Sequence, residues 1–113
     1  MDEPEAYKIG WQPFLGLKIY LDSRPLIPRP ETEWWTGLAL NTLTTNSQLT
    51  TLDLCAGSGA IGCAALARLP NAQVYFGEID PVHETTILKN IRENNLDDSR
   101  AFVRIGDLFE PFG

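Results

Sequence analysis

The sequence of this 113-residue chain is poor in residues that bind metal ions or form disulfides. It has two cysteines, Cys55 and Cys63, one histidine, His83, and no Cys-x-x-Cys pair. A structural zinc site needs about four ligands, so we expect no metal site. Both cysteines lie in apolar or small-residue segments, which predicts packed, reduced thiols and a reducing compartment.

Long hydrophobic runs and clusters of positive charge are absent as well. No stretch approaches the ~20 apolar residues that cross a bilayer, and the acidic start Met-Asp-Glu-Pro-Glu does not resemble a signal peptide. We therefore expect a cytoplasmic protein without membrane contact. The net charge is −6, and the 9 basic residues form no cluster. Since nucleic-acid binding depends on clustered Lys and Arg, direct binding of DNA or RNA is not expected.

The residues that are present predict an α/β fold. A hydrophobic content of 43% indicates one globular core. Apolar runs predict strands at 49–55, 73–79 and 101–105. Small-residue or amphipathic segments between them predict helices at 60–69 and 81–95. On the second of these helices, Ile87, Leu88 and Ile91 are expected to form one apolar face. The alternation indicates βαβ units and a parallel sheet.

The first 45 residues have a different pattern. Short extended segments occupy residues 9–22, a proline-rich stretch follows at 25–30, and a helix is predicted at 31–43, with Pro30 and two acidic residues at its start. Trp34 and Trp35 on this helix are expected to pack in the core or in an interface.

A glycine turn, Gly57-Ser58-Gly59, connects the first strand of the sheet to its helix. Such a turn lets a ligand approach the backbone beside the free N–H groups of the helix, although any tight turn also favours glycine. Glu78 follows Gly57 by 21 positions at the end of the next strand, where a carboxylate accepts the hydroxyls of an adenosine ribose. Asp80 is a competing candidate, but it precedes Pro81 and is expected to cap the following helix.

The third strand ends in Gly106-Asp107-Leu108-Phe109, where a carboxylate beside an apolar residue suits an adenine ring. Nicotinamide enzymes share the turn and the acid, with the fingerprint Gly-x-Gly-x-x-Gly. Here the run Cys55-Ala56-Gly57-Ser58-Gly59 is closer to the Glu/Asp-x-Gly-x-Gly form of methyltransferases. The sequence therefore favours S-adenosylmethionine over a nicotinamide cofactor.

Four segments together carry a family resemblance. Residues 26–33 (Leu-Ile-Pro-Arg-Pro-Glu-Thr-Glu), 52–61, 78–81 (Glu-Ile-Asp-Pro) and 106–109 resemble the protein-(glutamine-N5) methyltransferases, the HemK/PrmC group, which modify translation release factors. The resemblance implies the first three strands of a class I methyltransferase Rossmann-like sheet, preceded by an extended arm and a helix. It divides the chain into an N-terminal arm, 1–45, and the first half of an S-adenosylmethionine-binding domain, 46–113.

The resemblance also implies roles for particular residues. The methionine part of the cofactor is expected along Cys55, Ala56, Gly57, Ser58 and Gly59. Glu78 is expected to bind the ribose, and Asp107 and Leu108 the adenine. Glu31 and Thr32 would lie on the active-site wall. The family usually has glycine at the position of Cys55, so the backbone there is expected to lie slightly further from the ligand.

The family's Asn-Pro-Pro-Tyr motif, expected after a fourth strand, does not occur in this sequence. We assign no catalytic residue and expect the chain alone to be inactive toward its expected substrate, the Gly-Gly-Gln loop of a peptide chain release factor. Two alternatives remain: part of an N6-adenine nucleic-acid methyltransferase, or a non-catalytic domain that binds adenosyl ligands. Without a fourth strand, the strand at 49–55 is expected to have a free edge, either covered by the N-terminal arm or paired with a second copy.

Overall fold

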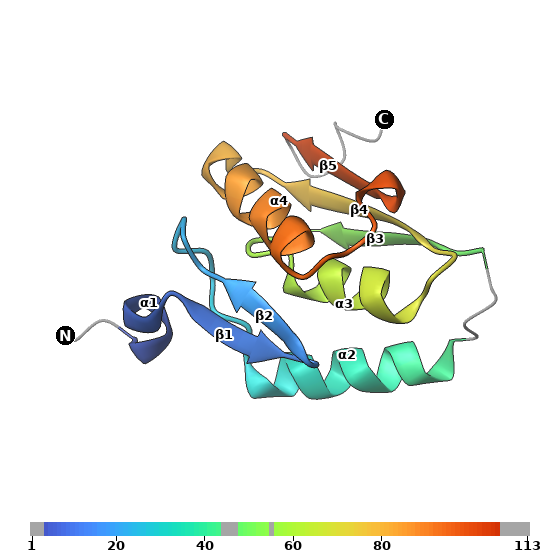
Figure 1. Cartoon of the computed structure of the whole chain (residues 1–113), viewed down its shortest axis with the longest axis horizontal. Helices are drawn as coiled ribbons and strands as arrows, with labels where there is room; N and C mark the ends of the chain where they lie inside the picture. The colour runs from blue at the N-terminus through green and yellow to red at the C-terminus, as the bar shows by residue number, and fades with distance from the viewer. Residues whose placement is uncertain (1–3, 44–47, 55, 107–113) are drawn as a thin grey trace.

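The computed structural model describes residues 4–43, 48–54 and 56–106, which form a parallel sheet, an antiparallel hairpin and their surrounding helices (Figure 1). The sheet has three strands in the order β3-β4-β5. Their bounds are β3, Thr50–Leu54; β4, Gln73–Glu78; and β5, Ala101–Ile105. The predicted parallel sheet is confirmed, with β3 beginning and β4 ending one residue inside the predicted bounds.

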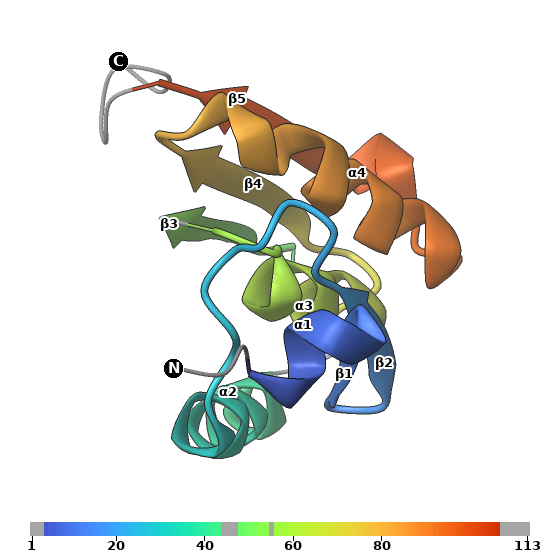
Figure 2. The same ribbon diagram turned by 90° about the vertical axis from the view of Figure 1, so that its left-hand side faces the viewer.

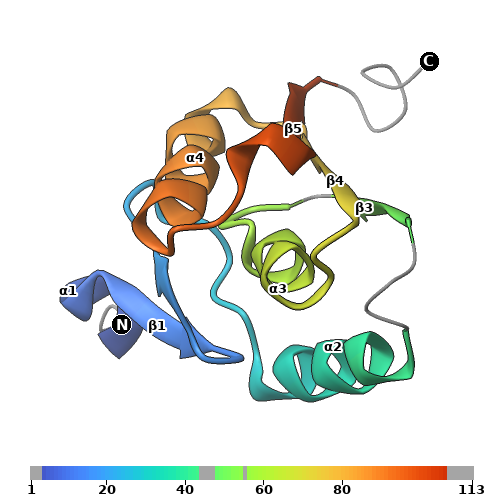
Figure 3. The same ribbon diagram turned by 45° about the vertical axis from the view of Figure 1, so that its right-hand side comes forward.

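Helices α3 (Ala60–Arg68) and α4 (Glu84–Glu93) lie against the same face of this sheet (Figures 2 and 3). Two successive right-handed crossovers that move in the same direction across a sheet place both helices on one side. The other face carries the row Leu52, Tyr75 and Phe102, in which the two rings stack with centroids 4.8 Å apart. Leu52 is 47% exposed. Parallel sheets are normally covered on both faces, so this face is open within the described part of the chain.

The core lies between α3 and the sheet. Small residues of α3 let the helix approach closely, so that Cys63, Ala64 and Leu66 are buried against Val74 and Phe76. Burial raises the pKa of the Cys63 thiol, and the nearby Asp53 carboxylate adds to the shift. The predicted packing of this cysteine in the interior is confirmed. Cys55 lies outside the described residues.

Helix α4 presents two of its three predicted apolar residues to the core. Ile87 and Ile91 are buried, whereas Leu88, at the margin of the same face, is 47% exposed. Leu88 lies three residues before Ile91, a spacing that shares a helical face, and both line a hollow between α4 and β5. The helix is also shorter than expected, because the 3₁₀ turn η1 (Pro81–His83) precedes it.

The N-terminal residues form α1 (Glu5–Ile9) and a hairpin of β1 (Trp11–Phe14) and β2 (Leu17–Tyr20). Both turn residues, Leu15 and Gly16, have positive φ angles, 47° and 84°, as a two-residue type I′ hairpin turn requires. The Leu15 N–H donates a hydrogen bond of 2.6 Å to Glu33 Oε2 on α2 (Pro30–Thr42). The hairpin is thereby fixed to the helix that follows the proline-rich arm.

Helix α2 begins and ends one residue before the predicted bounds, and its aromatic pair does not enter the core. Trp34 and Trp35 are 60% and 64% exposed and contact each other edge to face, with ring centroids 5.0 Å apart. The predicted burial of this pair in the core is wrong. Gly37 and Leu40 form the buried side of α2 instead. Among the described residues, no helix combines the length and apolar content needed to cross a bilayer.

Candidate adenosyl-ligand site

The glycine turn lies between β3 and α3 at the carboxyl edge of the sheet. Gly57 and Gly59 have φ angles of 58° and 81°, in the left-handed region that favours glycine. The Gly59 N–H donates to the Ala56 carbonyl at 2.8 Å, and the Ala56 N–H donates to the Gly77 carbonyl of β4 at 2.9 Å. The turn is therefore closed on itself and attached to the neighbouring strand.

Glu78 ends β4 directly beside this turn. One carboxylate oxygen accepts a hydrogen bond from the Gly57 N–H at 2.8 Å, and the other accepts from the Asp80 N–H at 2.9 Å. The residue is 7% exposed. Asp80 itself accepts from the Val82 N–H at 3.0 Å, so it caps η1 as expected. The fold thus brings together the turn and the acidic residue that the sequence singles out.

Asp53 is a third polar residue of this edge, and sequence reasoning gave it no role. Its carboxylate accepts a hydrogen bond from the Gly62 N–H at 3.0 Å, in the first turn of α3. Burial raises the pKa of Asp53 to about 6, the Gly62 N–H opposes the shift, and the charge of Glu78 adds to it. An acidic residue inside the otherwise apolar strand 52–54 is the signal that was available.

Gly62 corrects the earlier interpretation of the glycine pattern. Gly57, Gly59 and Gly62 together satisfy Gly-x-Gly-x-x-Gly, and a Cβ on Gly62 would lie 2.2 Å from the Phe76 ring. Gly62 therefore has the place of the third fingerprint glycine, which permits close packing of helix on strand. The glycine spacing alone does not separate methyltransferases from nicotinamide enzymes.

The proline-rich arm forms the opposite wall of a pocket above the turn. The pocket has a volume of about 230 Å³ and is lined by two segments: Leu26, Ile27, Pro28, Arg29 and Thr32 from the arm and α2, and Ala56, Gly57, Ser58, Ala60 and Ile61 from the turn and α3. Thr32 is thus in the pocket, whereas Glu31 is exposed and not among the lining residues. Asp107 and Leu108 lie outside the described residues.

A larger hollow of about 810 Å³ lies elsewhere, between α4 and β5, and includes Leu88 and Val103. It lacks the glycine turn, and it follows the outer side of the sheet rather than its carboxyl edge; Glu78 lines neither space but bonds to Gly57 of the turn. In open α/β sheets, ligands bind outside the carboxyl ends of the strands. We therefore take the pocket at the turn as the candidate site. Within the described ranges, no three His, Cys, Asp or Glu side chains form a group able to hold a metal ion.

Comparison with solved structures defines the class of fold. Trm5b from Pyrococcus abyssi matches with a TM-score of 0.73 at 18% identity, over 88% of this chain and 28% of that one. TYW2 from M. jannaschii, solved in complex with AdoMet, matches with a TM-score of 0.68 at 18% identity, over 86% of this chain and 42% of that one. At these identities the likeness shows the fold. The predicted Rossmann-like α/β fold of class I methyltransferases is confirmed.

The chain belongs to the family described as conserved hypothetical protein 95, whose family model matches residues 24–109. A release factor glutamine methyltransferase from Chlamydia trachomatis is 36% identical over 110 residues, covering 96% of this chain and 37% of the relative. One from Bifidobacterium longum is 38% identical over 93 residues, covering 80% of this chain and 32% of the relative. The resemblance to glutamine methyltransferases is confirmed, and the chain spans about a third of the length of these relatives.

Proposed function

We propose that this chain is the cofactor-binding part of an S-adenosylmethionine-dependent methyltransferase that acts on a glutamine of a peptide chain release factor. The observation that carries the proposal is the contact between Glu78 and Gly57 at the carboxyl edge of a parallel sheet. Relatives named for this activity and a neighbouring structure solved with AdoMet support it.

In this proposal, Glu78 binds the ribose of the cofactor. A carboxylate has about four lone-pair sites, and its contacts to Gly57 and Asp80 leave acceptor capacity on both oxygens. The two ribose hydroxyls donate to these remaining sites. The methionine part extends along residues 55–59 toward the pocket under the arm, with Thr32 and Glu31 on the acceptor side. Asp107 and Leu108 receive the adenine.

The two parts of the chain have separate tasks in this proposal. Residues 46–113 supply the turn and the ribose-binding carboxylate, while residues 1–45 supply the proline-rich wall of the pocket. We place the protein in the cytoplasm, which agrees with the buried, unpaired Cys63 thiol. The net charge of −6 argues against nucleic acid as a partner.

A calorimetric titration with S-adenosylhomocysteine tests the proposal. Glu78→Ala removes the ribose acceptor and is expected to weaken binding at least about tenfold, because hydrogen bonds to charged groups contribute roughly 1.5–3 kcal/mol each. Asp80→Ala is the matched control, since it removes a carboxylate from the same edge without removing the contact to Gly57. Equal affinities of the two variants would exclude Glu78 from the site, and NAD⁺ binding in place of S-adenosylhomocysteine would exclude the methyltransferase class.

The chain by itself is expected to transfer no methyl group to a release factor. An amide nitrogen is a weak nucleophile because its lone pair is delocalised into the carbonyl, so attack on the sulfonium methyl needs acceptors that orient and polarise the amide. The sequence contains no Asn-Pro-Pro-Tyr motif to supply them. Incubation with labelled cofactor and a release factor carrying a Gly-Gly-Gln loop measures this. Methyl incorporation above background would mean that a residue of this chain performs the task.

We also propose that a second copy of the chain pairs with the outer edge of β3. This strand ends the described sheet, and the adjoining open face carries the half-exposed Leu52. Sedimentation over a range of concentrations is expected to show self-association that Leu52→Lys reverses, because a charge on an edge strand opposes pairing. A chain that stays monomeric at every concentration would contradict this.

A further inference from the structure

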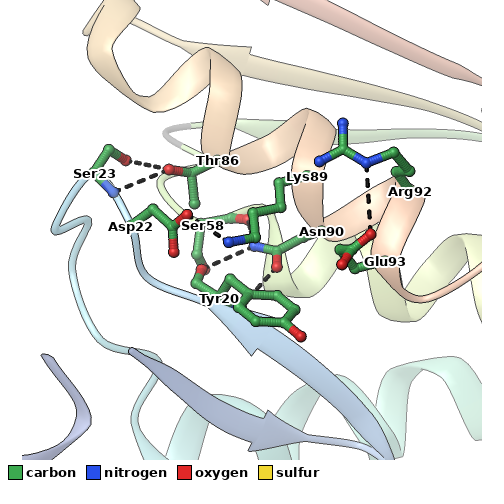
Figure 4. A network of polar contacts seen from close by, with 9 residues as sticks. All are labelled: Tyr20, Asp22, Ser23, Ser58, Thr86, Lys89, Asn90, Arg92 and Glu93. Carbon is green, nitrogen blue, oxygen red and sulfur yellow. Dashed lines mark hydrogen bonds and ion pairs between the residues drawn. The ribbon is translucent and has the colours of Figure 1, made fainter. Parts of the chain in front are cut away.

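Helix α4 and its C-cap residue, Asn94, contact the edge of β2 through one asparagine side chain each. Asn90 Oδ1 accepts from the Tyr20 N–H at 2.6 Å, and Asn90 Nδ2 donates to the Tyr20 carbonyl at 3.0 Å (Figure 4). Asn94 repeats the arrangement on Lys18, accepting from its N–H at 2.9 Å and donating to its carbonyl at 2.9 Å. Each amide side chain thus substitutes for one residue of a neighbouring strand.

The spacing of the two asparagines matches the spacing of their two partners on β2. Asn90 and Asn94 lie four residues apart, about 6 Å along an α-helix. Lys18 and Tyr20 lie two residues apart, about 6.6 Å along a strand, and so have their N–H and carbonyl groups on the same edge. One face of α4 therefore satisfies the otherwise unpaired edge of the hairpin.

Asn90 makes one contact that Asn94 does not. Its Nδ2 also donates to the Ser58 carbonyl of the glycine turn at 2.8 Å, and the residue is 0% exposed. Both hydrogens of the Asn90 side-chain amide are therefore donated, one to β2 and one to the turn. Figure 4 shows the side chain between these two segments. A single buried amide thereby joins α4, the hairpin and the glycine turn.

The same hairpin holds the arm that forms the other wall of the pocket. Gln12 Nε2 of β1 donates to the Pro28 carbonyl at 2.7 Å, and the Tyr7 hydroxyl of α1, which precedes the hairpin, donates to the Pro25 carbonyl at 2.6 Å. The arm lines the 230 Å³ pocket opposite Gly57 and Ser58. A chain of hydrogen bonds thus runs from the turn through Asn90 and the hairpin to the arm.

From this arrangement we propose that Asn90 is a positioning residue for the adenosyl-ligand site, which holds the glycine turn and the proline-rich arm in register. The ligand part of the inference rests on the proposed function, while the positioning of the turn does not. Asn90 is buried beneath the turn, and in this proposal it acts through the Ser58 carbonyl and the hairpin rather than by touching the ligand.

Asn90→Ala and Asn94→Ala form the pair for the test, because both lose two contacts to β2. Asn90→Ala also loses the contact to the turn, whereas Asn94→Ala loses a hydrogen bond of 2.9 Å to the Asn90 carbonyl of its own helix. Hydrogen exchange of the 113-residue chain without ligand measures the Gly57 and Gly59 amides. In Asn90→Ala these amides are expected to exchange about tenfold faster, after correction for global unfolding, as the loss of a buried hydrogen bond implies. In Asn94→Ala they are expected to keep the wild-type rate. Affinity for S-adenosylhomocysteine follows the same order.

Equal exchange of the turn amides in the two variants would overturn the proposal. If the wild-type chain binds no S-adenosylhomocysteine, the proposed function fails, and the exchange comparison still decides the role of Asn90. If Asn90→Ala does not fold, hydrogen exchange of the side-chain amides of Asn90 and Asn94 in the wild-type chain tests the proposal instead. The two protons on Asn90 Nδ2 are then expected to exchange more slowly than those of the more exposed Asn94, and equal rates would contradict the positioning role.

Discussion

The Glu78 carboxylate accepts a hydrogen bond of 2.8 Å from the Gly57 N–H, 21 residues earlier in the chain. This contact joins the ends of two parallel strands and holds the turn in its left-handed conformation. It also leaves the carboxylate in the position where a ribose is expected to bind. The same side chain therefore shapes the site and is proposed to bind the ligand.

Glu78→Gln separates these two tasks. The amide keeps one oxygen to accept from Gly57 or Asp80, but its NH₂ group then faces the other N–H. We expect a faster exchange of one of these two amides and roughly tenfold weaker binding of S-adenosylhomocysteine, since a charge-assisted acceptor is lost. Amide exchange and calorimetry measure the two effects. Unchanged binding with altered exchange would show that Glu78 only shapes the turn.

Gly62→Ala is expected to destabilise the chain by about 1–3 kcal/mol, the usual effect of overpacking a core. A Cβ at this position would lie 2.2 Å from the Phe76 ring, which is itself fully buried. Gly37→Ala is the control, because it also lies in a helix and its Cβ would meet only the end of the Leu15 side chain at 3.3 Å. Urea unfolding of both variants is the measurement, and equal stabilities would show that α3 does not pack closely on β4.

Asp53→Asn is expected to stabilise the chain at neutral pH. Burial raises the pKa of Asp53 in the folded state from 3.8 to about 6, so the folded chain binds this proton more tightly than the unfolded chain. The ionised carboxylate therefore lowers the free energy of unfolding progressively as the pH rises from about 4 to about 6, and fully above that. Asp53→Asn carries no ionisable group at this position, so its free energy of unfolding at neutral pH is expected to be higher by about 1–3 kcal/mol. Parallel stability curves for both proteins between pH 4 and 8 would contradict the shift.

Arg100 ends the turn η2 (Asp98–Arg100), and its guanidinium satisfies the carbonyl groups at the end of α3. It donates to the Leu66, Leu69 and Ala72 carbonyls at 3.0, 2.8 and 2.9 Å. Arg100→Ala is expected to cost about 1–3 kcal/mol, because part-buried acceptors lose their donors. Arg100→Lys is expected to recover less than half, since an ammonium group lacks the planar fork.

Chemical unfolding measures the Arg100 variants, with Arg92→Ala as the control. Within the described part of the chain, the Arg92 side chain forms one ion pair, with the exposed Glu93 at 3.5 Å, and its removal is expected to change stability by no more than about 0.5 kcal/mol. A full rescue by Arg100→Lys would show that charge alone stabilises the end of α3.

The sequence predicted those features that follow from local pattern. The strands, their parallel order and the shared sheet edge of the turn and Glu78 depend on apolar periodicity and on the right-handed crossover. The hydrogen bond between Glu78 and Gly57 was not predicted. The exposure of Trp34, Trp35 and Leu88 was not predictable from hydropathy, because it depends on which elements pack around each helix. The role of Asn90 was hidden for a similar reason, since its partners Tyr20 and Ser58 lie 70 and 32 residues away.

The most direct test of the account is where S-adenosylhomocysteine binds on the chain. Titration of the ¹⁵N-labelled protein, followed by heteronuclear NMR, locates the ligand residue by residue. We predict saturable shifts at Gly57, Ser58, Gly59 and Glu78, and none along the 810 Å³ hollow between α4 and β5. Shifts confined to that hollow, or none anywhere, would contradict the assignment of the glycine turn and Glu78 as an adenosyl-ligand site.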